Sequence, residues 1–164
     1  MAGSFSIRVA KENFKFSAAH FIAYPGFRER LHGHNYRVSV HIEGSLAATG
    51  YVLDFGVVKQ VVAEILETLN ERVLLPANSD CLTIALDSEQ VRVRYENDEF
   101  LFPAADVCLL PIAHSSAEEL ARYLWDRIRQ ALADRKASAG LTAMEVSVAE
   151  AAGQSAFYRG KTQE

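Results

Sequence analysis

A strict two-residue alternation over residues 32 to 43 constrains the fold more than any other feature of the sequence. Successive side chains of a strand point to opposite faces of its sheet, so this pattern predicts an antiparallel strand with one buried and one solvated face. The expected buried face carries His32, His34, Tyr36, Val38, Val40 and Ile42, and the expected solvated face carries Asn35, Arg37, Ser39, His41 and Glu43.

Periodicity also predicts the other elements. Residues 5 to 20 alternate as a second strand, which places Phe14, Phe16, Ala18 and His20 on one face. In chain order we expect strands over 5–20 and 32–43, a helix over 55–69, a meander of three short strands over 81–102, a helix over 116–136 and a strand over 142–150. This order predicts an α+β fold, an antiparallel sheet with helices on one face, in a single domain of residues 1–164.

Both helices carry capping signals. Asp54 is the expected N-cap of the first helix. Ser116, with Glu119 three residues later, has the spacing of a capping box for the second helix, and Gly140 is expected to close that helix.

Composition narrows the class of protein. The chain has 164 residues, a net charge of -4 and no strongly basic stretch, which argues against a nucleic-acid partner. Cys81 and Cys108 lie far apart in apolar surroundings, and we expect both to be reduced thiols. No apolar run is long enough to cross a membrane, so we expect a soluble, cytoplasmic protein.

Three histidines occupy positions that suit a metal. His32 and His34 leave the same face of one strand, and His20 ends the other strand on its apolar face. If the two strands pair, three imidazoles converge and leave a fourth position open, as in catalytic zinc sites. An isolated HxH is common without a metal, but unpaired imidazoles on an apolar face would be costly. His41 is expected to be solvated, since it lies on the polar face.

Five motifs resemble the 6-pyruvoyl-tetrahydropterin synthase family, which includes the 6-carboxy-tetrahydropterin synthases. They are FSAAH at 16–20, LHGHNY at 31–36, LDFG at 53–56, SSAEELARYLW at 115–125 and VSVAE at 146–150. The resemblance implies a tunnelling fold, with a four-stranded antiparallel sheet and two helices on one face. It also implies a homo-oligomer, trimer or hexamer, with pterin sites at subunit interfaces. The implied zinc ligands are His20, His32 and His34.

The resemblance also assigns substrate-binding residues. Glu150 matches the carboxylate that anchors the pterin ring, whose amino group and ring N–H can both donate to one carboxylate. Glu118 and Ser116 match a second stretch at the pterin pocket, although Ser116 is equally suited to capping the helix.

Two parts of the family's catalytic machinery are replaced. Arg28 stands where close relatives have a catalytic cysteine, and Asn70-Glu71 stands in place of an Asp-His pair. Glu29 forms an ExxHGH pattern, which resembles an aldolase-like branch that cleaves dihydroneopterin triphosphate to 6-hydroxymethyl-dihydropterin. A carboxylate beside the metal can act as general base. Alternatively, Glu29 is one charge of a solvated Arg-Glu-Arg run; Glu71 and His114 are further candidates for proton transfer.

These observations favour a zinc-dependent lyase that acts on 7,8-dihydroneopterin triphosphate or a related reduced pterin. Arg28, Arg30 or Lys15 would meet the triphosphate. Two alternatives stay open: a non-catalytic zinc-containing homologue that binds a pterin or purine, and a zinc hydrolase of another heterocycle.

Overall fold

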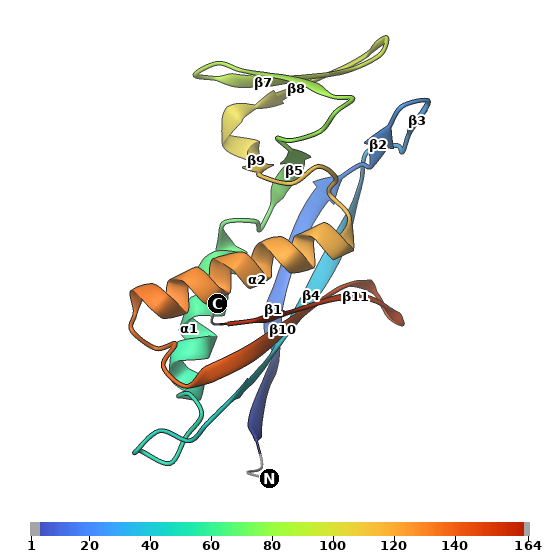
Figure 1. Cartoon of the computed structure of the whole chain (residues 1–164). Helices are drawn as coiled ribbons and strands as arrows, with labels where there is room; N and C mark the ends of the chain where they lie inside the picture. The colour runs from blue at the N-terminus through green and yellow to red at the C-terminus, as the bar shows by residue number, and fades with distance from the viewer. Residues whose placement is uncertain (1–3, 163–164) are drawn as a thin grey trace.

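The computed structural model describes residues 4–162 and places two helices on one face of a large sheet, with a small second sheet at one end (Figure 1). The elements are β1 (Phe5–His20), β2 (Ala23–Tyr24), β3 (Phe27–Arg28), β4 (His32–Gly44), α1 (Phe55–Glu67), β5 (Arg72–Pro76), β6 (Thr83–Leu86), β7 (Gln90–Tyr95), β8 (Asp98–Pro103), the 3-10 helix η1 (Ala104–Asp106), β9 (Val107–Leu110), α2 (Ala117–Asp134), β10 (Leu141–Ala151) and β11 (Gln154–Lys161).

The large sheet has the strand order β11-β10-β4-β1-β5-β9. Its first four strands are antiparallel, which confirms the expected four-stranded core. The sheet is nevertheless six-stranded, because β5 and β9 extend it in parallel beyond β1. Apart from Arg72, these two strands are short apolar runs without alternation, so periodicity did not reveal them. Nor did it reveal β11, which pairs with β10 as a hairpin.

Both helices cover the same face of this sheet (Figure 1), and the main core lies between them and the strands. The inner stripe of α2 repeats every four residues through Leu120, Leu124, Ile128 and Leu132, all of them buried. Each such side chain contributes about 2 kcal/mol when it leaves water. The indole of Trp125 also donates a hydrogen bond of 2.7 Å to the carbonyl of Met144 on β10.

The helix caps follow the sequence signals with two differences. Asp54 accepts a hydrogen bond from the backbone N–H of Gly56, and Ser116 accepts one from Glu119. The carboxylate of Glu119, however, accepts from the N–H of Ala113 at 2.9 Å, so only half of the expected capping box forms. The helix ends at Asp134, and the left-handed residue that follows it is Lys136, with φ 56, in place of the expected Gly140.

Strands β6, β7 and β8 form the expected meander, a separate antiparallel sheet with a small core of its own. It lies at the end of the molecule beyond β5 and β9 (Figure 1). The fully buried members of this second core come from three parts of the chain: Phe21, Ala23, Leu75, Val91, Val93 and Tyr95. The meander is therefore packed against the segment that follows β1.

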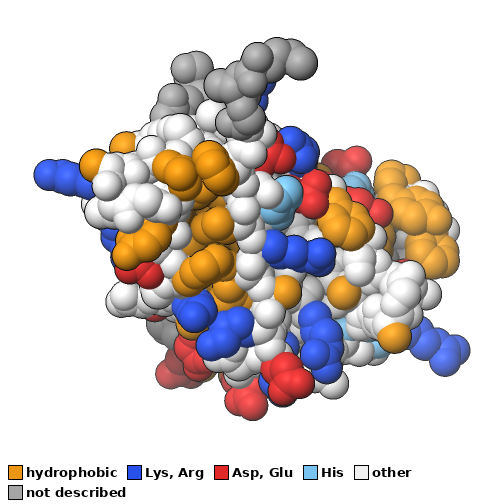
Figure 2. Space-filling view, turned by 90° about the horizontal axis from the view of Figure 1, so that it is seen from below, with side chains coloured by type: hydrophobic (Ala, Val, Ile, Leu, Met, Phe, Trp, Pro, Cys, Tyr) orange, Lys and Arg blue, Asp and Glu red, His pale blue; other side chains and the backbone are white. Residues whose placement is uncertain are grey.

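The opposite end of the molecule carries hydrophobic side chains on its surface (Figure 2). A groove of about 450 Å³ there is lined by the exposed side chains of Phe5, Leu46, Tyr51 and Phe55.

Neither Cys81 nor Cys108 is in a disulfide, as expected. Among the described residues, no helix is long and apolar enough to span a membrane.

Candidate functional site

Antiparallel pairing of β1 with β4 brings three histidines together. His20 lies directly opposite His32 in the register, and His34 lies opposite Ala18. One ring nitrogen from each of the three histidines lies within 4.8 Å of the other two. A metal ion can be held at this point by three imidazoles, as the strand pattern predicted.

Backbone carbonyls orient two of the rings. The Nδ1–H of His20 donates to the carbonyl of Ser115 at 2.7 Å, and the Nδ1–H of His32 donates to the carbonyl of Arg30 at 2.8 Å. In each ring this leaves Nε2 as the lone-pair nitrogen that can bind a metal. The Nε2 atom of His20 is buried and has no hydrogen-bond partner, which fits a position reserved for a metal.

The electrostatics of His20 favour the same role. Its side chain is 2% exposed, and burial lowers its pKa below the ordinary value of 6.5. The positive charges that His32 and His34 can take up lower that pKa further, while the Ser115 carbonyl and Glu150 oppose the shift. His20 is therefore neutral near pH 7, the form in which imidazole binds a metal.

The ring of Tyr36 packs beside the histidines, next to His20 and His34. Its ring stacks on Phe16 at 4.7 Å between centroids and lies 5.4 Å from the ring of His34. The side chain is fully buried, yet its hydroxyl has no hydrogen-bond partner. Burial raises its pKa, and the negative charges of Glu150 and Glu29 raise it further.

All three predicted substrate-binding residues line one cavity of about 270 Å³. Glu150 comes from the end of β10, while Ser116 and Glu118 come from the start of α2. The other lining residues are Ile22, Ala117, Gln154, Ser155 and Ala156. Ser116 thus caps α2 and also lines this cavity. The cavity offers carboxylates to a ligand that presents N–H donors.

Glu29 lies just after the short β2–β3 hairpin. Its Oε2 accepts a hydrogen bond of 3.0 Å from the N–H of Ile22, a residue that also lines the cavity. Its own N–H donates to the carbonyl of Ile22 at 2.9 Å. Glu29 is thus tied to the chain two residues beyond His20, which argues against a freely solvated charge run.

The remaining candidates, Glu71 and His114, do not line the cavity that contains Glu150. Glu71 lines a different groove, of about 470 Å³, which it shares with His34 of the histidine cluster as well as with Asn35 and Arg72. His114 is half-buried in the loop that leads to Ser115. The guanidinium of Arg28 is bound to Asp98 and not left free for a phosphate. Among the candidates, Glu29 is the one whose carboxylate is hydrogen-bonded to Ile22, a residue that lines the cavity of Glu150.

The family model for 6-pyruvoyl tetrahydropterin synthase matches residues 8–161 of this chain. The chain belongs to this family. It is 36% identical over 149 residues to a protein of Methanocaldococcus jannaschii described as a "putative 6-carboxy-5,6,7,8-tetrahydropterin synthase", and the match covers 88% of this chain and 89% of that one.

Two solved structures of Plasmodium proteins are also similar to this chain. A Plasmodium vivax 6-pyruvoyltetrahydropterin synthase, in a variant whose altered glutamate is described as a catalytic residue, superposes with a TM-score of 0.90 at 35% identity, covering 98% of this chain and 99% of that one. The Plasmodium falciparum 6-pyruvoyl tetrahydropterin synthase superposes with a TM-score of 0.89 at 36% identity, with the same coverage. The tunnelling-type α+β fold is thereby confirmed.

The sequence did not predict that Ser115 orients His20 or that the Tyr36 hydroxyl is buried without a partner beside the histidines. Ser115 acts through its backbone carbonyl, which no side-chain pattern reveals, and its hydroxyl donates to the carbonyl of Phe21 at 3.0 Å. For Tyr36 a signal was present, because a tyrosine continues the face that carries His32 and His34. A tyrosine hydroxyl on an apolar face usually has a hydrogen-bond partner, and the structure shows none for Tyr36 within the described part of the chain.

Proposed function

We propose that this protein is a zinc-dependent lyase of the 6-pyruvoyl tetrahydropterin synthase family. The proposed substrate is 7,8-dihydroneopterin triphosphate or a related reduced pterin, and the proposed product is 6-hydroxymethyl-dihydropterin. The observation that carries the proposal is the convergence of His20, His32 and His34 on one point. Glu29 is bound to Ile22, which lines the cavity that contains Glu150. In this proposal a ring-binding carboxylate, Glu150, and a second carboxylate, Glu29, would both serve the metal site.

His20, His32 and His34 fit zinc as neutral nitrogen ligands, two of them oriented by backbone carbonyls. When bound, zinc would polarise the side-chain oxygens of the substrate and favour loss of their protons. The family relationship supports zinc over other metals, since the resemblance in sequence implies the same three ligands. Three imidazoles with an open position are also the ligand set of known catalytic zinc sites.

Glu150 would hold the pterin ring. Its carboxylate can accept two parallel hydrogen bonds from the amino group and ring N–H of a pterin, which fixes the ring in plane. Glu118 and Ser116 lie around the same cavity and would contact the ring from the start of α2. Anchoring the ring in this cavity would leave the substrate side chain to extend toward the histidines.

Glu29 would act as the general base. In the proposed step its carboxylate takes the proton of the C2′ hydroxyl, and the C1′–C2′ bond breaks. The electron pair moves into the C6–N5 imine of the ring, and C1′ is then protonated to give the hydroxymethyl group. The other fragment leaves as glycolaldehyde triphosphate, so atoms and charges balance without a redox partner. The N–H of Ile22 binds Oε2 of Glu29, so the other carboxylate oxygen would accept the proton.

Assembly into a homo-oligomer, a trimer or hexamer, is part of the proposal. In the described part of the chain, β1 pairs with β5 only at Ala18 and Ala19, so most of the long outer edge of β1 is unpaired. At the other side of the sheet, β11 is an edge strand. Two unlike open edges favour head-to-tail association, which closes into a ring. Residues of a neighbouring subunit, Glu71 or His114 among them, would then complete the site.

The direct test is incubation of the zinc-loaded protein with dihydroneopterin triphosphate and identification of the products by mass spectrometry. We expect 6-hydroxymethyl-dihydropterin, and turnover should fall by at least about 100-fold in Glu29→Gln with pterin binding retained. Glu150→Gln should instead weaken pterin binding. Glu67→Gln, an exposed change on α1, is the matched control. Absence of this product would exclude the aldolase reaction.

The second candidate is a non-catalytic homologue that binds a pterin or purine, favoured by the replacement of the usual cysteine by Arg28 and of the Asp-His pair by Asn70-Glu71. It predicts tight pterin binding without turnover and no effect of Glu29→Gln on binding. Turnover that is lost in Glu29→Gln would exclude it.

A further inference from the structure

The segment that carries Glu29 has little support of its own. Strands β2 and β3 are two residues each and pair only at Ala23–Arg28 and Tyr24–Phe27. A hairpin this short is not stable in isolation. Its geometry, and with it the position of Glu29, must depend on contacts made with other parts of the fold.

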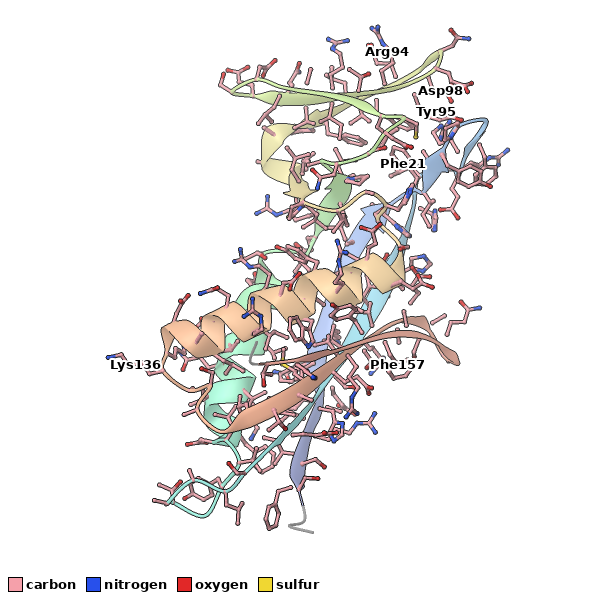
Figure 3. All side chains as sticks on the ribbon, viewed as in Figure 1. Phe21, Arg94, Tyr95, Asp98, Lys136 and Phe157 are labelled. Atoms are coloured by element: carbon pink, nitrogen blue, oxygen red, sulfur yellow. The ribbon has the colours of Figure 1, made fainter. Side chains whose placement is uncertain are left out.

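Those contacts come from the meander. The Arg28 guanidinium donates from Nε and Nη2 to one carboxylate oxygen of Asp98, at 3.0 and 2.6 Å. It also lies 5.0 Å over the ring of Phe100, which stacks on Phe21 at 5.0 Å. Figure 3 shows Phe21, Tyr95 and Asp98 together where the meander meets the segment after β1. There the hydroxyl of Tyr95 donates to the carbonyl of Tyr24 at 3.1 Å.

The same guanidinium reaches Glu29 directly. Nη1 of Arg28 donates to the backbone carbonyl of Glu29 at 2.8 Å. One planar group therefore joins Asp98 at the start of β8 to the main chain of Glu29, whose side chain and N–H are bound to Ile22. Of the ion pairs found within residues 4–162, Arg28–Asp98 is the one that connects the meander to another part of the chain.

We propose that Arg28 and Asp98 are positioning residues for Glu29, through an ion pair by which the meander holds the segment 21–30 against the metal site. The proposal rests on the proposed function, because it assigns to Glu29 the role of base. It also assigns a role to Arg28, at the position where close relatives have the catalytic cysteine: the side chain binds Asp98 and the backbone of its neighbour Glu29.

The exposure of the two side chains indicates that loss of the Arg28–Asp98 ion pair would act locally and not on global stability. The side chain of Asp98 is 55% exposed, whereas that of Arg28 is 20% exposed. Loss of a half-exposed carboxylate changes global stability little, because solvent screens most of its interaction. A displaced base, in contrast, loses much of its effect on the rate even when the shift is small.

The test compares zinc-loaded wild type with Asp98→Ala, Asp98→Asn and Glu99→Gln. Glu99 is the matched control, since it precedes Phe100 on the same strand and pairs with Arg92 and Arg94 inside the meander. With dihydroneopterin triphosphate as substrate, we expect kcat of Asp98→Ala to fall about tenfold with KM and zinc content nearly unchanged. Asp98→Asn, which keeps one acceptor oxygen, should recover part of kcat, and Glu99→Gln should behave as wild type.

Hydrogen exchange supplies a readout that does not depend on turnover. Backbone amides of residues 21–30 should exchange faster in Asp98→Ala than in wild type or Glu99→Gln, while the amides of α2 are unaffected. Unchanged exchange in 21–30, or a kcat within twofold of wild type in Asp98→Ala, would overturn the positioning role. Failure of the proposed function is seen separately, as absence of 6-hydroxymethyl-dihydropterin with the wild type or as full turnover in Glu29→Gln.

Discussion

The Nδ1 atom of His20 lies 2.7 Å from the carbonyl oxygen of Ser115, a residue 95 positions away in the chain. This contact links the end of β1 to the loop before α2, and it points Nε2 of His20 toward His32 and His34. The metal site therefore depends on the docking of α2 as well as on the pairing of two strands.

Replacement of His20 tests the ligand set. We expect His20→Ala to weaken zinc binding by more than about 100-fold, because a lost ligand costs more than a lost ligand-orienting group. Zinc content after dialysis, measured by atomic emission, reports the change. His41→Ala, on the opposite face of the same sheet, should retain full zinc content. Equal zinc loss in both variants would contradict the assignment.

The hydroxyl of Ser115 can be separated from its carbonyl. Ser115→Ala removes the buried hydrogen bond to the carbonyl of Phe21 and leaves that acceptor unpaired. We expect the free energy of unfolding to fall by about 1–3 kcal/mol in denaturant titrations. Zinc affinity should change little, since the backbone carbonyl that orients His20 is still present. A large loss of zinc with unchanged stability would show that the hydroxyl has the orienting role.

Acid should destabilise the zinc-free protein through His20. Burial lowers the pKa of this imidazole in the folded state, so below its ordinary value of 6.5 the unfolded chain takes up a proton that the folded chain does not. Stability is therefore lost as the pH falls through 6.5, by at most about 1.4 kcal/mol per pH unit for one group. Urea titrations at several pH values measure the slope. In His20→Gln the slope should be reduced, and an unchanged slope would assign it to other groups.

Tyr36 offers a test of substrate contact. Because its buried hydroxyl has no partner, Tyr36→Phe should leave stability unchanged or raise it by up to about 1 kcal/mol. If the hydroxyl donates to the bound substrate, kcat/KM should nevertheless fall about tenfold, the cost of one hydrogen bond. Tyr158→Phe is the control, since this ring packs on Trp125 away from the histidines. Loss of stability without loss of activity would show a structural role.

Much of the site was predictable because it lies on regular strands. The alternation over 32 to 43 placed His32, His34 and Tyr36 on one face, and the same period placed His20 on the neighbouring strand. Family motifs then placed Glu150, Glu118 and Ser116 at a common pocket, and the structure brings these residues around one cavity. The fold's extra strands β5 and β9 were not predictable in this way, since both are short and, apart from Arg72, apolar without alternation.

The sequence by itself determined the faces of the strands and the identity of the three imidazoles, because both follow from a period of two along the backbone. Only the tertiary structure decided what surrounds them. Three arrangements join residues distant in the chain: the carbonyl of Ser115 on His20, the contact between Arg28 and Asp98, and the cavity shared by Glu150 and Glu118. Such contacts arise from packing, which no local periodicity encodes.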